Sequence, residues 1–219
     1  MVQSERILPA FPLSLAVCPG EAVPLHIFEP RYKSMIAHCR ARESEGLPGE
    51  FVIVCSDGSD WRKVGCVMRI ATLLRTYDDG RMDLIAIGKQ RCAIEPADEP
   101  VPYPTALIAP YEDLSTEWDE SVANQVFYLH RRLIALATGS EPPESEYSGL
   151  ATLSFRVMPT SALSLLRKQE LLEMRSENDR LLSLAEHLRD SVDLLVQAER
   201  SVLAIQNARA ALAAVRAAS

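Results

Sequence analysis

The segment from Gly20 to Cys39, GEAVPLHIFEPRYKSMIAHC, gathers the side chains of this chain whose types and spacing come closest to a chemical site. His26 and Glu29 are three residues apart and His38 adjoins Cys39, so a Cys/His/Glu metal site is one interpretation. Zinc ligands are normally paired on a hairpin or on one face of a helix. Here a predicted step from strand to helix separates them. We therefore expect ordinary packed or surface positions and no metal.

Other signatures of catalysis are absent from the sequence. The single Gly-Lys pair, Gly88-Lys89, lacks the upstream glycine and the following Ser or Thr of a phosphate-binding loop. The chain has no G-x-S-x-G elbow and no H-E-x-x-H motif. No two carboxylates share an apolar setting, which is what acid–base catalysis needs. The sequence predicts neither catalytic nor cofactor-binding residues.

Composition limits the classes of function. The 219 residues are 47% hydrophobic and 24% charged, which is typical of a globular protein with a buried core. The formal net charge of −7 argues against a general affinity for nucleic acid, because that affinity needs clustered basic residues. No predicted signal peptide or transmembrane helix is present, so we expect a cytoplasmic protein. The cysteines form no C-x-x-C pair and have apolar neighbours, which favours buried, reduced thiols: Cys18, Cys39, Cys55, Cys66 and Cys92.

The first half of the chain must supply strands. All 9 glycines and 14 prolines precede residue 160, and apolar or alternating runs lie between them. Asp79-Gly80 predicts a tight turn between two long strands, and Gly88 predicts a bulge or bend. A helix is expected over 30–42. The simplest assembly of residues 1–114 is a partly closed, six-stranded barrel with one inserted helix; the strands are predicted over 5–11, 22–28, 51–56, 63–76, 81–95 and 103–111.

Residues 115–219 are predicted to form a helical bundle. Apolar periodicity indicates a helix over 117–138 that ends at Gly139 and a short one over 150–157. Thr160 or Ser161 is expected to cap the next helix, and a long helix follows from Ser176. The last twenty residues are rich in alanine, which favours helix but packs weakly. This tail either frays or offers a small-residue face to a partner helix, so an oligomer through it is one expectation.

Several separated motifs occur in order along the chain. Two later segments carry Gly65, Gly88 and Arg91, then Lys168, Gln169, Glu173 and Arg180. The opening LPAFPLSLAVCPGEAVPLHIFEPRYKSMI contributes Leu8, Pro9, Phe11, Pro12, Leu13, Pro19, Gly20, Pro24, Leu25, His26, Ile27, Phe28, Glu29, Pro30, Arg31 and Tyr32. Together these motifs resemble the N-terminal domain of Lon proteases, and the likeness extends over residues 5–196. Cys66 and Val67 replace the family's usual Thr and Ala.

This resemblance implies an α+β fold, a PUA-like pseudo-barrel followed by a helical bundle. It also implies a non-enzymatic substrate-recognition or adaptor module that binds unfolded or apolar polypeptide segments and presents them to a separate protease. Full Lon proteases carry an ATPase module and a Ser–Lys peptidase, which this sequence lacks, so a standalone domain is expected. The alternatives are a PUA-like RNA-binding module, against which the acidic charge argues, and a peptidase by family name only.

Two interpretations of the Gly20–Cys39 segment stay open. In the first it is a structural corner, where Glu29 and Arg31 cap and pair while Phe28 and Tyr32 pack. In the second its exposed members form part of a peptide-binding surface. The candidate residues for that surface, or for the corner, are Pro24, Leu25, His26, Phe28, Glu29, Arg31 and Tyr32.

Overall fold

A six-stranded sheet forms the first half of the chain in the computed structural model, which describes residues 5–58, 60–115, 117–147 and 152–217. Every predicted strand is present in the range where alternating or apolar runs placed it. The strands are Arg6–Leu13 (β1), Ala22–Ile27 (β2), Glu50–Cys55 (β3), Val64–Thr76 (β4), Met82–Ala97 (β5) and Thr105–Pro110 (β6).

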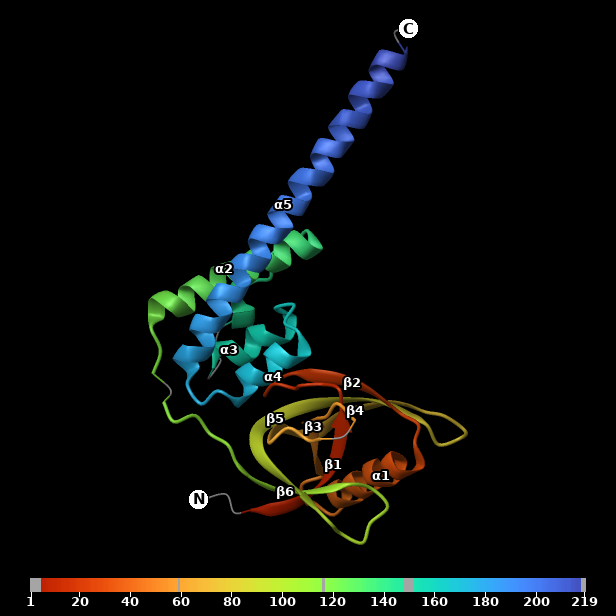
Figure 1. The fold of residues 1–219 in the computed structure, drawn as a ribbon. Helices are drawn as coiled ribbons and strands as arrows, with labels where there is room; N and C mark the ends of the chain where they lie inside the picture. The colour runs from red at the N-terminus through yellow and green to blue at the C-terminus, as the bar shows by residue number, and fades with distance from the viewer. Residues whose placement is uncertain (1–4, 59, 116, 148–151, 218–219) are drawn as a thin grey trace.

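The long strand β5 closes the sheet on itself. It pairs with β4 along its length, with β2 through its first half and with β6 through its second half. The strand order is β2-β5-β4-β3-β1-β6, and the additional β5–β6 pairing joins five strands into a ring while β2 stays outside it (Figure 1). The predicted α+β arrangement is confirmed, with a ring-like sheet of six strands rather than a complete barrel.

A β-bulge interrupts β5 at the predicted glycine. Met68 pairs with Gly88 but its neighbour Val67 pairs with Gln90, so Lys89 is the extra residue on β5. A Cβ atom at Gly88 would lie 2.3 Å from the carbonyl oxygen of Cys18. Glycine is therefore required because the backbone before β2 crosses β5 at close range.

One helix packs against the inner side chains of the sheet. It spans Pro30–Ser44 (α1), with Pro30 in its first turn as predicted. Tyr32, Met35 and Ile36 from this helix pack against strand residues such as Phe51 to form one core. A second cluster lies on other strand faces and includes Val52, Val54, Val67, Ile94 and Ile108. All five cysteines are free and buried, which confirms the expected thiols.

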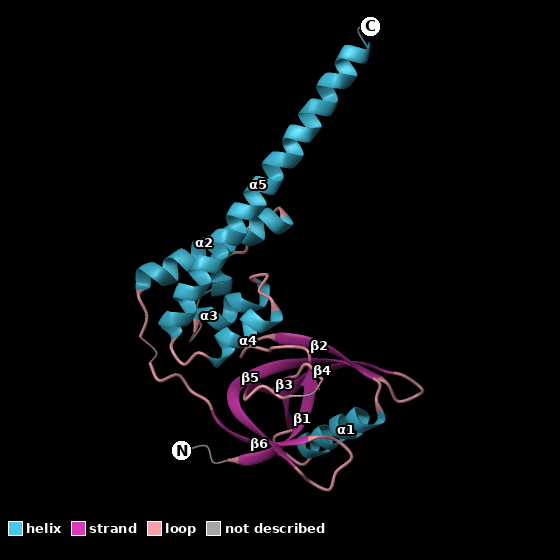
Figure 2. Cartoon of the chain, in the orientation of Figure 1, coloured by secondary structure: helices cyan, strands magenta, loops and turns pink. Residues whose placement is uncertain are grey.

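The second half is helical (Figure 2), with one correction to the predicted boundaries. Neither Thr160 nor Ser161 caps the helix that follows them, because the chain first makes a 3-10 turn and then passes through Ala162 at a φ of 54°. Ser164 is the cap, accepting from the N–H of Arg167. The elements are Glu120–Thr138 (α2), Glu144–Tyr147 (η1), Leu153–Val157 (α3), Met158–Thr160 (η2), Leu165–Glu173 (α4) and Glu177–Ala217 (α5).

Helix α5 has two parts with different surroundings. Its first half packs against α2 and α3 in the bundle core through Leu181, Leu184 and Leu188. Its second half extends well beyond the other helices (Figure 1). The side chains of 201–209 are exposed, including Val202 and Ile205, so this stretch does not pack against the described remainder of the chain. The first residues of the short helix predicted over 150–157 lie outside the described residues.

Candidate functional site

Helix α4 attaches the bundle to the sheet through polar contacts. Gln169 donates from Nε2 to the carbonyl oxygen of Val64 at 2.9 Å, in buried surroundings. Arg62 donates from Nε and Nη2 to the two carboxylate oxygens of Glu173, both at 3.0 Å. Such a two-point pair fixes direction as well as distance. The motif residues 169 and 173, recognised in the sequence, therefore hold one part of the molecule against the other.

A third contact from α4 shapes the loop before β2. Lys168 Nζ lies 2.8 and 2.9 Å from the carboxylate oxygens of Glu21, and these side chains are only 12% and 15% exposed. Glu21 also accepts from the backbone N–H of Cys18 at 2.8 Å. Gly20, at a φ of 82°, permits the turn between them. The Pro19–Ala22 segment is consequently fixed in position beside the bundle.

A buried ionic network lies behind that loop. Arg180 of α5 contacts both oxygens of Asp113, at 2.7 and 2.5 Å, and Glu177 at 2.7 Å. Arg91 of β5 reaches the same Asp113 and donates to the carbonyl oxygens of Leu172 and Met174 at 2.7 and 2.6 Å. Two cations and two carboxylates thus balance one another where sheet and bundle meet. If one of these groups were removed, the buried charges left without a partner would destabilise the fold.

The network also sets the protonation of its members. Burial opposes ionisation of Asp113, but hydrogen bonds and charge from Arg180 and Arg91 outweigh it and hold the pKa of the carboxyl below its usual value. Burial lowers the pKa of Arg91, while the carboxylates of Asp113 and Glu177 raise that of Arg180 despite its burial. Arginine remains charged in either case because its pKa is so high. Asp113 is therefore ionised at neutral pH, beside two charged guanidinium groups.

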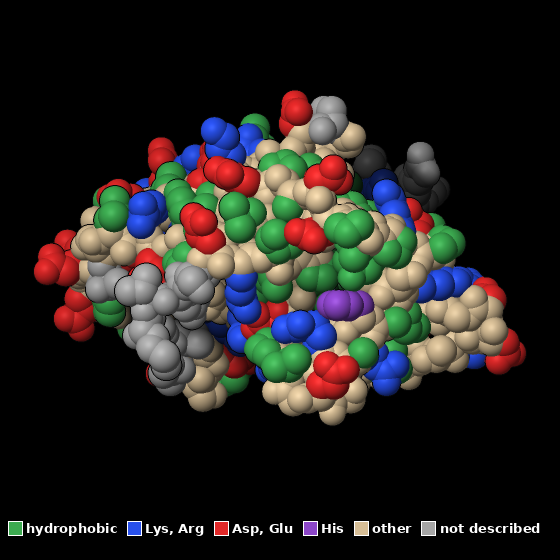
Figure 3. Space-filling model, turned by 90° about the horizontal axis from the view of Figure 1, so that it is seen from below, with side chains coloured by type: hydrophobic (Ala, Val, Ile, Leu, Met, Phe, Trp, Pro, Cys, Tyr) green, Lys and Arg blue, Asp and Glu red, His purple; other side chains and the backbone are tan. Residues whose placement is uncertain are grey.

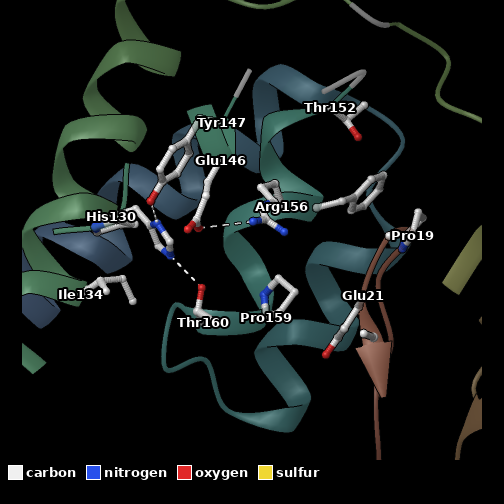
Figure 4. Close-up of a pocket in the computed structure, with 14 residues that line it drawn as sticks. Pro19, Glu21, His130, Ile134, Glu146, Tyr147, Thr152, Arg156, Pro159 and Thr160 are labelled. Atoms are coloured by element: carbon white, nitrogen blue, oxygen red, sulfur yellow. Dashed lines mark hydrogen bonds and ion pairs between the residues drawn. The ribbon is translucent and has the colours of Figure 1, made fainter. Parts of the chain in front are cut away.

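A pocket of about 670 Å³ opens between the Pro19–Ala22 segment and the bundle (Figure 4). Figure 4 shows Pro19 and Glu21 on one side and His130 and Ile134 on the other. Most of its lining area is contributed by apolar atoms, as in ligand pockets generally. The lining residues are Pro19, Gly20, Glu21, Ala22, His130, Ile134, Pro142, Glu146, Tyr147, Thr152, Phe155, Arg156, Pro159 and Thr160.

The polar groups of this pocket are already engaged with one another. His130 Nδ1 is 2.7 Å from the hydroxyl of Tyr147, and its Nε2 is 2.8 Å from Oγ1 of Thr160. Burial, and secondarily the charge of Arg156, lowers the pKa of His130 to about 4, so the ring is neutral at neutral pH. Arg156 pairs with Glu146 at 3.4 Å. An apolar ligand would therefore leave few of these groups without partners.

Some candidate residues of the Gly20–Cys39 segment are buried and others are exposed. Leu25 and Tyr32 are buried, and the Tyr32 ring contacts Phe11 at 4.2 Å between centroids, which confirms the packed corner for Tyr32. The expectation that Phe28 packs is wrong, because it continues the alternation of β2 on the exposed side and is 59% exposed. Pro24 and His26 share that exposed side.

The two charged candidates lie at the start of α1. Glu29 is the residue before the first turn, yet its side chain makes no capping hydrogen bond. It accepts from Arg31 instead, at 2.8 Å, so the predicted pairing is confirmed and the predicted capping by a side chain is wrong. His26 is hydrogen-bonded to Asp83, with Nδ1 2.5 Å from Oδ1.

In the ranges 5–58, 60–115, 117–147 and 152–217 no group of three or more His, Cys, Asp or Glu side chains could hold a metal ion. Within the same part of the chain, no helix combines the length and the apolar character needed to cross a membrane.

The sequence does not predict the pocket. Nothing in the spacing of residues 19–22, 130–134, 142–147 and 152–160 indicates that they meet. Among the lining residues, the family resemblance includes Pro19 and Gly20, and Thr160 is a predicted helix cap. The other lining residues carry no sequence signal because their positions follow from the way helices pack.

Comparisons with known proteins agree with this architecture. Two solved structures are similar to it: the N-terminal domain of the Mycobacterium avium complex Lon protease, and a Lon N-terminal domain protein from Xanthomonas campestris. The first is 18% identical with a TM-score of 0.60, covering 84% of this chain and 99% of that one. The second is 21% identical with a TM-score of 0.61, covering 82% and 96%. At these identities the likeness concerns the fold.

The family itself is identified by a sequence model. The model of the ATP-dependent protease La (LON) substrate-binding domain matches residues 7–190, from the second residue of β1 into the first half of α5. The matched range also holds every residue of the pocket and of the buried ionic network. This chain belongs to the family of the ATP-dependent protease La (LON) substrate-binding domain.

Proposed function

We propose that this protein binds apolar segments of unfolded polypeptides, without enzymatic activity, in the pocket between the Pro19–Ala22 segment and the bundle. The observation that carries the proposal is a largely apolar pocket of about 670 Å³ with walls from both parts of the molecule. Membership of the family supports the general role of a substrate-recognition module. A volume of this size accommodates a few side chains of an extended chain.

Charge distribution favours a peptide over nucleic acid. Near the exposed side of β2, Arg31 is paired with Glu29, and Arg81 is paired with Asp79. The face in Figure 3 mixes acidic and basic side chains among hydrophobic ones and shows no large patch of one sign. Affinity for a polyanion depends on unopposed basic groups. RNA binding therefore remains the weaker alternative.

In the test, this protein is added to a labelled, unfolded casein fragment, and binding is measured by fluorescence anisotropy. Ile134→Glu places a carboxylate in the pocket wall, and we expect it to weaken binding about tenfold or more, since burying an unpaired charge is costly. Tyr128→Glu is the matched control, because Tyr128 is 64% exposed on the same helix and outside the lining. Equal loss in both variants, or none in either, would contradict the proposed pocket.

Two further arms address the alternatives. Structured RNA is added to the complex and is expected not to displace the peptide. The casein fragment is then recovered and its length measured, and we expect it intact. Displacement by RNA that weakens steeply with salt would favour a nucleic-acid-binding role. Cleavage that is abolished by one substitution in this chain would show an enzyme instead.

A further inference from the structure

Strand β2 has one unpaired edge. It stands at the end of the strand order and pairs with β5 alone among the described strands. An exposed edge presents backbone N–H and C=O groups that another strand can bind. The side chains that accompany this edge, at Ala22, Pro24, His26 and Phe28, are all exposed.

The register identifies which backbone groups point outward. Gly88 donates its N–H to the carbonyl oxygen of Glu21 at 2.9 Å, and the β2–β5 register then runs without interruption from Ala22↔Ile87 to Ile27↔Met82. In an antiparallel pair, residues alternate between facing the partner strand and facing away. Residues 21, 23, 25 and 27 face β5, so residues 22, 24 and 26 direct their backbone groups to the open side.

Pro24 limits this edge without closing it. Proline has no N–H, and natural sheets place it on edges to discourage uncontrolled pairing. The N–H groups of Ala22 and His26 and the carbonyl groups of residues 22, 24 and 26 remain. Two donors and three acceptors suffice for a short, reversible strand pairing, while the missing donor at the centre disfavours permanent association.

The open edge is continuous with the pocket. Gly20, Glu21 and Ala22 belong to the pocket lining, and β2 begins at Ala22. From there the edge runs past Pro24 and His26 to the exposed ring of Phe28. Figure 4 shows this end of β2 beside the pocket, across from His130 and Ile134. A chain that enters the pocket in an extended conformation can therefore continue along β2.

We propose that extended apolar polypeptide segments bind by adding a strand to the open edge of β2, from the pocket to Phe28. This inference rests on the proposed function and specifies its geometry. Backbone pairing is independent of sequence, which suits a binder of many unfolded chains. The polar side chains next to this edge already have partners, since His26 is hydrogen-bonded to Asp83 and Arg31 is paired with Glu29. An uncharged segment with apolar side chains at alternate positions is the occupant that fits.

The first experiment adds the missing donor. Pro24→Ala supplies a backbone N–H at the centre of the edge and leaves the bonds to β5 unchanged. A labelled peptide of alternating valine and serine, about ten residues long, is titrated against both proteins. One added hydrogen bond is expected to tighten binding about three- to tenfold. Unchanged affinity in Pro24→Ala, with wild-type binding intact, would overturn strand addition and leave the pocket proposal standing.

The second experiment removes a donor. His26→Pro eliminates an outward N–H, and His26→Ala is its control, because it loses the same imidazole but keeps the N–H. We expect the proline variant to bind several-fold more weakly than the alanine variant. A peptide methylated at alternate backbone nitrogens should also bind more weakly than the unmodified peptide. Equal affinities in both comparisons would contradict backbone pairing. Absence of any binding by the wild-type protein would instead overturn the proposed function itself.

Discussion

Arg180 and Asp113 meet in a two-point ion pair, Nη1 to Oδ1 at 2.7 Å and Nη2 to Oδ2 at 2.5 Å. The side chains are 0% and 6% exposed, although one belongs to the long C-terminal helix and the other to the segment between β6 and α2. Asp113 also accepts from Arg91 of the sheet. One carboxylate thus links three distant parts of the chain.

Removal of that carboxylate should be strongly destabilising. Asp113→Ala leaves two buried guanidinium groups short of a partner, and we expect a loss of about 3–5 kcal/mol in the free energy of unfolding. Glu170→Ala is the control, because its pair with Arg167 is 42% and 39% exposed and should contribute under about 1 kcal/mol. Urea unfolding measures both. A loss at Asp113 as small as that at Glu170 would contradict the assigned role of the network.

The sheet and the bundle should unfold together. We propose 1–114 and 115–219 as two structural units, and the Arg62–Glu173 pair and the Asp113 network connect them. In Trp118→Phe, Trp61 remains as the one tryptophan and reports on the sheet, while far-UV circular dichroism reports on the helices. Coincident urea transitions are expected. Two separate transitions would show that each unit is stable without the other.

His130 should make stability depend on pH. Burial, then the charge of Arg156, lowers its pKa to about 4, so the unfolded state binds the proton first as pH falls. Stability from this group is present above its ordinary pKa and is lost on acidification, by about 2 kcal/mol from about pH 7 to about pH 5. The His130→Gln variant should lose less stability than the wild-type protein over this pH range. His38→Gln keeps His130, and a flattened pH dependence in that control would contradict the assignment.

The close approach at Gly88 should exclude any larger residue. In Gly88→Ala the new Cβ would be 2.3 Å from the carbonyl oxygen of Cys18, and we expect a cost of about 3 kcal/mol. Gly46→Ala separates steric from conformational effects: Gly46 has a φ of 76° but open space around it, so about 1 kcal/mol is expected. Equal losses measured in urea would mean that backbone conformation, not contact, explains both.

Particular residues show how far the sequence can be interpreted. Alternation at 22–28 predicted β2 correctly, and Gly139 ends α2 in a left-handed conformation as expected. The cap at Thr160 or Ser161 was wrong because hydroxyl residues occur three times between 160 and 164, and local preference does not choose among them. Phe28 does not pack as expected, because its place in the alternation puts it on the exposed side.

The order of strands and helices, the absence of compact catalytic motifs and the family resemblance can all be obtained from the sequence alone. These depend on turn residues, periodicity and spacing, which act over a few neighbours. Tertiary packing alone brings residues 19–22, 130–147 and 152–160 around a pocket and joins Arg91, Asp113 and Arg180 in one network. Such contacts arise from the packing of elements far apart in the chain, and no local pattern encodes them.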